Sequence, residues 1–268
     1  MHHATSSALA AILFASLTAA ALGDPFEQMK PGSPEAKAAL AAATRPVDAT
    51  AVLGTTLPEV KLDRVPLSDA IDGLRDLTGG NISLNEAALA AAGVGRATPV
   101  TLQMEKVTVA EALEAILKPL ADKGVRYQAD KEAMYVSTKL DLEALAAFRE
   151  RHAALLAAPG PSNPRLVITE GESLHRPNVR YEPPGPMVLR EVLADLSRRS
   201  GVEIRADMDV LAQTGIKGKQ IIRLQLRNPT LGDALTQVLW KTGQIHELDL
   251  EVDGMTITVV PRVRAKAA

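Results

Sequence analysis

The stretch that decides the fold is VTLQMEKVTVAEALEAIL, residues 100–117, because its hydrophobic pattern changes period in the middle. Apolar and polar residues alternate from Val100 to Met104, which is the period of a half-buried strand. Thr108 and Glu111 then form a Thr-x-x-Glu capping box, and apolar residues follow at helical spacing. The stretch therefore predicts a strand that leads directly into an amphipathic helix.

This stretch belongs to a longer internal repeat. Residues 67–117 align on residues 189–239 at one constant offset and without a gap. The alignment keeps both hydrophobic periods in register, together with residues that begin or end helices. We therefore interpret most of the chain as two copies of one small module. The identical pairs that mark element ends are Gly79/Gly201, Gly93/Gly215 and Thr108/Thr230.

Each copy predicts the order strand, helix, strand, small helix, strand, helix and hairpin. We expect an α+β fold of two tandem small modules, each with the order βαβ(α)βαββ and two main helices packed on small sheets. The second hairpin turns at Asp253-Gly254, a strong hairpin dipeptide. The expected divisions are a flexible segment over 24–56, module 1 over 57–138, a helical linker and loop over 139–177, module 2 over 178–261 and a basic tail over 262–268.

The N-terminus has the pattern of a secretory signal peptide. Residues 8–22 are apolar or small, and this uncharged run is too short to span a bilayer comfortably. A small-x-small site ends at Gly23, so we expect a signal peptide over 1–23 and a mature chain that begins at Asp24. The sequence has no cysteine, which excludes disulfides, thiolate metal sites and a lipoprotein anchor. We expect a periplasmic or secreted protein with no transmembrane segment after signal removal.

Three segments resemble a known family. VPLSDAIDGLRDLTGGNISLN (65–85), residues 100–117 and VRYQADKEAMYVST (125–138) are similar to the secretin and TonB N-terminus short domain. The resemblance implies a periplasmic domain used for docking, which faces the inner-membrane assembly in secretins and signals to a regulator in TonB-dependent receptors. No pore-forming or barrel-forming region follows the second copy, so we expect neither a complete secretin nor a receptor. The resemblance fixes no binding residue.

The remaining patterns favour a non-enzymatic protein. A formal net charge of -2 supplies no basic excess for nucleic acid. No nucleophile motif, acid–base pair or metal-ligand spacing can be assigned, and we interpret His152, His175 and His246 as surface residues. We expect a docking or adaptor protein whose partners are envelope or secretion-system proteins, with no cofactor and no metal. Homo-oligomerisation is left open.

Sheet edges are the predicted partner-binding sites, because an open edge can accept a strand from a partner. Two other functions are kept as alternatives. The first is a cleft between the modules for a glycan or small ligand, with Trp240 or Tyr181 at its rim. The second is an extracytoplasmic hydrolase with an unrecognised site. The residues predicted to lie on partner-binding edges are Arg126, Tyr127, Tyr135, Leu248, Leu250 and Thr256.

Overall fold

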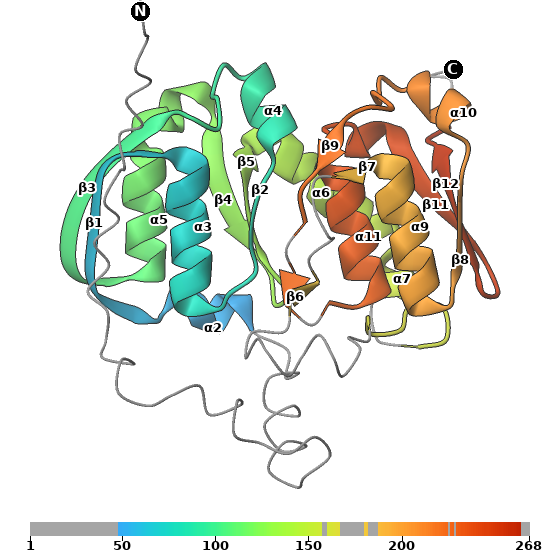
Figure 1. The fold of residues 1–268 in the computed structure, drawn as a ribbon, viewed down its shortest axis with the longest axis horizontal. Helices are drawn as coiled ribbons and strands as arrows, with labels where there is room; N and C mark the ends of the chain where they lie inside the picture. Colours follow the sequence, from blue (N-terminus) through green and yellow to red (C-terminus); the bar gives the residue numbers. More distant parts are fainter. Residues whose placement is uncertain are drawn as a thin grey trace, which may run out of the picture.

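A computed structural model describes residues 48–156, 160–166, 180–181, 187–224, 226–227 and 229–263. The fold is α+β, with helices and several small antiparallel and mixed sheets (Figure 1). Gly23 and Asp24, the predicted cleavage site, lie outside the described residues, as does the Tyr181 side chain.

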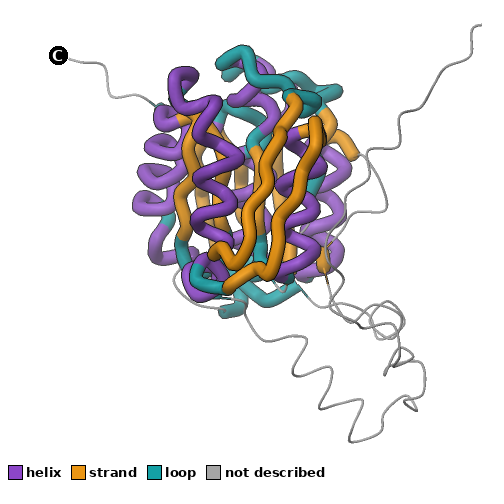
Figure 2. The backbone as a smooth tube through the Cα atoms, turned by 90° about the vertical axis from the view of Figure 1, so that its left-hand side faces the viewer, coloured by secondary structure: helices purple, strands orange, loops and turns teal. Residues whose placement is uncertain are grey.

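The N-terminal half, which we define as residues 48–138, places two helices between two sheets. Helices α3 and α5 lie between the ribbon β1–β3 and the sheet β2-β5-β4 (Figures 1 and 2). Apolar residues from all these elements form one core. The elements are α2 (Ala49–Leu53), β1 (Thr56–Pro66), α3 (Leu67–Thr78), β2 (Ile82–Leu84), α4 (Glu86–Ala91), β3 (Pro99–Thr108), α5 (Val109–Leu117), the 3-10 helix η1 (Lys118–Lys123), β4 (Val125–Ala129) and β5 (Met134–Thr138).

Among the described residues, two helices follow the N-terminal half, and the C-terminal half, defined as residues 180–263, comes after them. The connecting helices are α6 (Lys139–Arg151) and α7 (Ala153–Leu156). The elements of the C-terminal half are β6 (Arg180–Tyr181), β7 (Met187–Val188), α9 (Leu189–Ser200), β8 (Glu203–Ala206), α10 (Met208–Ala212), β9 (Ile221–Ile222), β10 (Leu226–Arg227), α11 (Leu231–Trp240), the 3-10 helix η2 (Ile245–Glu247), β11 (Leu248–Asp253) and β12 (Thr256–Pro261).

The two three-stranded sheets have the same topology. In the first, β5 is central, β2 runs parallel to it and β4 antiparallel. In the second, β12 is central, β8 runs parallel to it and β11 antiparallel. The aligned residues Ile82 and Ile204 pair with Met134 and Ile257, respectively. The sequence repeat therefore coincides with a repeat in strand pairing.

The predicted helix ends are confirmed. Gly79 and Gly201 end α3 and α9 in the left-handed region, with φ of 64° and 70°, where a glycine avoids the steric cost of a side chain. Thr108 caps α5 in a capping box with Glu111, and Thr230 accepts from the backbone N–H of Asp233 at the start of α11. These ends fix where each main helix begins and stops.

The sheet β2-β5-β4 lies between the cores of the two halves and contributes side chains to both. Met134 and Val136 of β5 pack into the core of the N-terminal half. Ala133 and Tyr135 point the other way, into the core of the C-terminal half. Because successive side chains of a strand point to opposite faces, β5 is buried on both faces. In β12, by contrast, buried and half-exposed residues alternate over Thr256–Val259, as expected for a sheet covered on one face.

Two expected boundaries differ from the packing. Helix α6 was expected to be a linker, but Leu142, Leu145 and Phe148 are buried in the second core because the outer face of the first sheet needs a cover. Helix α2 lies within the segment expected to be flexible, and its Ala49 is buried in the first core. The packed structure therefore begins before residue 57.

The Phe148→Ala variant tests whether α6 is part of the core. We expect it to lower the free energy of unfolding by about 3–5 kcal/mol, because it removes a buried aromatic ring and leaves a cavity. Leu140→Ala on the same helix is the control, since Leu140 is 78% exposed and should cost less than about 0.5 kcal/mol. Equal, small effects in urea denaturation would show that α6 is only a connector.

Candidate functional site

The structure places four of the six predicted edge residues on edge strands. Arg126 and Tyr127 lie on β4, and Leu248 and Leu250 lie on β11, each at the edge of its sheet. The prediction for Tyr135 and Thr256 is wrong, because β5 and β12 are the central strands. A hairpin pattern identifies two neighbouring strands but does not show which of them a third strand joins.

The first part of the β11 edge is covered by the end of α6. Arg151 donates from Nη2 to the carbonyl oxygen of Leu248 at 3.3 Å, and the backbone N–H of Leu250 donates to His152 Nε2 at 3.4 Å. The side chains of Leu248 and Leu250 are themselves buried. Neither leucine is therefore available to a partner. His152 was expected at the surface, but its side chain is only 10% exposed.

The outer end of β11 is open. Residues 251–253 are exposed, and β12 is the only strand that pairs with them among the described residues. Antiparallel strands alternate between groups that face the partner strand and groups that face away, so the N–H and C=O of Val252 point outward like those of Leu250. The Val252 side chain is 44% exposed, and Met255 in the adjoining turn is 46% exposed. We call residues 251–255 the β11 tip.

The β4 edge is a second, more polar candidate. Within the described ranges β4 pairs only with β5, so its other edge carries no strand. Arg126 is exposed, whereas Tyr127 packs against the first core. Burial, and then the charge of Glu114, raise the pKa of the Tyr127 hydroxyl. Of these two residues, only Arg126 offers an exposed side chain to a partner.

A polar network joins the two halves around Asp141. The Oδ2 atom of Asp141 accepts hydrogen bonds from Ser137 Oγ at 2.6 Å, Asn85 Nδ2 at 2.9 Å and Trp240 Nε1 at 2.5 Å. Asn85 Nδ2 also donates to the carbonyl oxygen of Trp240 at 2.8 Å. Burial raises the pKa of the Asp141 carboxyl, while these hydrogen bonds oppose the shift. We call this set of residues the joint.

Trp240 stands at the centre of the joint. Its ring meets the Tyr135 ring edge-on, with centroids 5.3 Å apart and planes at 89°. Its exposed fraction is 0%, so it does not lie at the rim of a cleft as the ligand-binding alternative expected. Tyr135 packs on the Trp240 ring, and both side chains are buried where the two halves meet.

Helix α11 also covers the outer edge of β2. Ser83 Oγ donates to Gln237 Oε1, and Lys241 Nζ donates to the carbonyl oxygen of Leu84 at 3.0 Å. Arg149 of α6 adds ion pairs to Asp130, at 3.4 Å, and to Asp233 of α11, at 3.6 Å. Buried polar groups need such partners, so these contacts fix how the two halves sit against each other.

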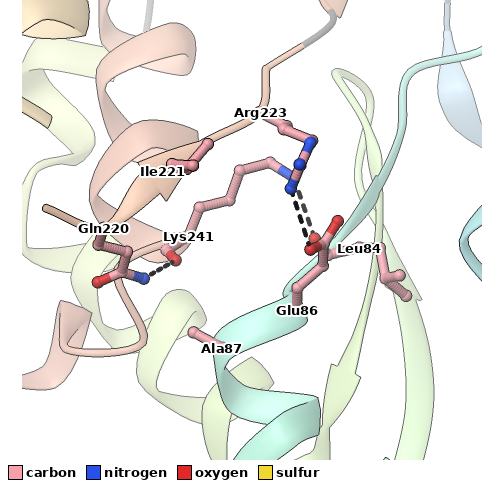
Figure 3. Close-up of a pocket in the computed structure, with 7 residues that line it drawn as sticks. All are labelled: Leu84, Glu86, Ala87, Gln220, Ile221, Arg223 and Lys241. Carbon is pink, nitrogen blue, oxygen red and sulfur yellow. Dashed lines mark hydrogen bonds and ion pairs between the residues drawn. The ribbon is translucent and has the colours of Figure 1, made fainter. Parts of the chain in front are cut away.

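A cavity of about 220 Å³ lies beside the joint, between the two halves (Figure 3). Lys241 runs along it, and burial lowers the pKa of its ammonium from 10.5 to about 8. Arg223 Nη1 lies 3.5 Å from Glu86 Oε2, and Gln220 Nε2 donates to the carbonyl oxygen of Lys241 at 3.0 Å. The lining residues are Leu84, Glu86, Ala87, Gln220, Ile221, Arg223 and Lys241.

A cleft between the modules was kept as an alternative, but with Trp240 or Tyr181 at its rim. Sequence reasoning missed the residues that line this cavity because the repeat does not mark them. Within the aligned stretch, Arg223 corresponds to Thr101 of the first copy. Continued two residues past the stretch, the same offset matches Lys241 with Pro119. The cavity exists only where the β2–α4 connection of one half meets the β9 region of the other. No local pattern predicts that meeting.

The described residues contain no group of three or more His, Cys, Asp or Glu side chains that could hold a metal ion. Within the same ranges, none of the helices combines the length and apolar character needed to cross a bilayer.

The Lys241→Met variant tests the buried charge in the cavity. Below pH 8 the lysine is protonated in both the folded and the unfolded protein, and the cost of burying its charge is fully present. Between pH 8 and about 10.5 the folded protein releases this proton first, so the stability of the unmodified protein should rise relative to Lys241→Met by about 1–3 kcal/mol. Urea denaturation across this range measures the difference. A constant or falling difference would contradict the burial of a charged ammonium.

Comparison with known proteins gives no match: no family model, no curated protein and no solved structure is similar to the chain at a significant level.

Proposed function

We propose that the chain is an exported, non-enzymatic docking protein of the bacterial envelope, built by tandem duplication of one small α+β module. The duplication is supported by the gap-free repeat, the equal helix ends and the shared strand pairing of Ile82 and Ile204. The module's kinship with the secretin and TonB N-terminus short domain is supported by the quoted segments.

The β11 tip is the observation that carries the docking proposal. An unpaired strand edge presents backbone donors and acceptors that a partner strand can satisfy, and natural proteins usually cover or charge such edges. In β11 the first part of the edge is covered by Arg151 and His152. The tip is not covered, and it carries two exposed carboxylates, Glu251 and Asp253, beside two exposed apolar side chains. This selective cover favours a short partner segment that adds to β11 over residues 251–253.

The charge of the tip indicates what the partner segment contains. Glu251 and Asp253 flank Val252, and both are exposed. An extended segment with one apolar side chain between basic residues would match this pattern, because opposite charges placed across paired strands are favourable. We therefore infer that the partner is an envelope or secretion-system protein with a basic, extended segment.

The joint makes the docking surface rigid. Asn85, Asp141 and Trp240 bind the two halves through hydrogen bonds, and both halves pack on the same sheet. The open edges of β4 and β11 therefore keep a fixed separation and orientation. Docking on pre-formed surfaces requires less ordering than docking on flexible modules, which favours binding.

The Val252→Pro variant tests docking at the β11 tip. Proline removes the outward N–H of Val252 without removing a β11–β12 hydrogen bond, so the fold should persist while strand addition is blocked. We expect a photo-crosslinker at position 255 to capture a defined envelope protein in cells of the native host. Capture should fall about tenfold with Val252→Pro.

Val252→Thr is the matched control, since it keeps the N–H and a β-branched side chain. It should leave capture unchanged. Equal capture by the proline and threonine variants would exclude strand addition at this edge, and capture of no protein by any of the three forms would contradict docking there.

The export proposal predicts a mature chain that begins at Asp24. Protein recovered from the envelope or the medium should have that N-terminus by mass spectrometry. Gly23→Trp should accumulate as the longer precursor, because signal cleavage needs a small residue at that position, whereas Gly23→Ala should be processed normally. Retention of the unprocessed chain in the cytoplasm would contradict export.

A further inference from the structure

The cavity beside the joint has an excess of positive charge. Lys241 and Arg223 both line it, and Glu86 is the one carboxylate among its lining residues. Arg96 Nη1 also lies 4.0 Å from the same Glu86 oxygen that faces Arg223. Two arginines therefore share one carboxylate, and the ammonium of Lys241 has no carboxylate within ion-pair distance among the described residues.

The donors of this cavity are only partly used. An ammonium carries three N–H donors and a guanidinium five. In the described part of the chain, Lys241 Nζ donates to the Leu84 carbonyl oxygen, and Arg223 contacts Glu86 at 3.5 Å. Figure 3 shows the ends of both side chains converging above Glu86. Donors that converge with spare capacity in a partly enclosed site suit an anion with more than one oxygen.

Apart from Gln220, the rest of the cavity lining is apolar. Ala87 and Leu84 lie on the side of the N-terminal half, and Ile221 of β9 lies opposite with a 50% exposed side chain. An exposed isoleucine beside cations gives the site an apolar part next to a charged part. Its volume of about 220 Å³ is below the usual range of drug-sized ligand sites, about 300–1,000 Å³, so the ligand must be small.

We propose that this cavity binds a small monocarboxylate, whose carboxylate lies between Lys241 Nζ and Arg223 and whose short apolar body packs on Ile221 and Ala87. The ligand would contact both halves at once, and its site is separate from the β11 tip. The proposal therefore does not depend on docking.

Protonation of Lys241 gives the binding a defined pH dependence. Glu86 and Asp72 favour the charged form of Lys241, whereas Arg75 and Arg223 oppose it. A bound carboxylate next to the ammonium also favours the charged form, so bound ligand raises the lysine pKa above about 8. The ligand should bind best below pH 8, where the lysine is charged without help. Affinity should fall as the pH rises above 8, because binding must then be accompanied by uptake of a proton.

Titration of the full protein with sodium butyrate tests the proposal. Trp240 is the only tryptophan of the chain and adjoins Lys241, so its fluorescence and calorimetry can both report binding. We expect saturable binding of butyrate, weaker binding of acetate, and no binding of butyramide, which has the same shape without the charge. Butyrate affinity should fall about tenfold or more with Lys241→Met or Arg223→Gln.

Lys217→Met is the matched control, because Lys217 is exposed and does not line the cavity. It should bind butyrate like the unmodified protein. Should Lys241→Met fail to fold, Arg223→Gln and the comparison of butyrate with butyramide still decide the question. Equal binding of butyramide, equal loss in Lys217→Met, binding of inorganic phosphate in place of butyrate, or no saturable binding would each overturn the proposal.

Discussion

The rest of the structure depends on one constraint: strand β5 is covered on both faces. Its residues Met134 and Val136 complete one core, while Tyr135 reaches the other and meets Trp240. A half that supplied its own sheet and helices would leave the outer face of that sheet in water, as β12 does. Here α6 and α11 cover this face of β5 instead, so the two small cores pack together as one larger unit. Larger cores bury a greater share of their surface, which favours stability.

The halves differ most where they meet. The positions of α11 that contact the N-terminal half are polar or aromatic and buried. At the same offset in the first copy, the positions in α5 and just after it are half-exposed or exposed. Ser83 of β2 and Asn85, just after β2, likewise align with charged, exposed residues in and just after β8. These pairs, with the residue at the contact between the halves first, are Gln237/Ala115, Trp240/Lys118, Ser83/Arg205 and Asn85/Asp207.

The sequence predicted features that depend on neighbouring residues, such as helix ends. It did not predict contacts between segments that are far apart along the chain. Glycine at a helix end and Thr-x-x-Glu at a helix start act within one turn, so Gly79, Gly201 and Thr108 predicted their elements. The continuous burial of β5 depends on elements far along the chain, so Tyr135 was assigned to an edge although it lies in a central strand. The cover of Leu250 by His152 and the cavity at Lys241 arise in the same way, from contacts between distant segments.

The central claim is that the joint makes the two halves one cooperative unit. Differential scanning calorimetry of the purified protein, with hydrogen exchange of the Trp240 indole N–H, tests it most directly. We predict a single unfolding transition whose calorimetric and van't Hoff enthalpies agree. We also predict that the Trp240 indole proton exchanges only through global unfolding. Two separate transitions, with the indole proton released in the first, would contradict it.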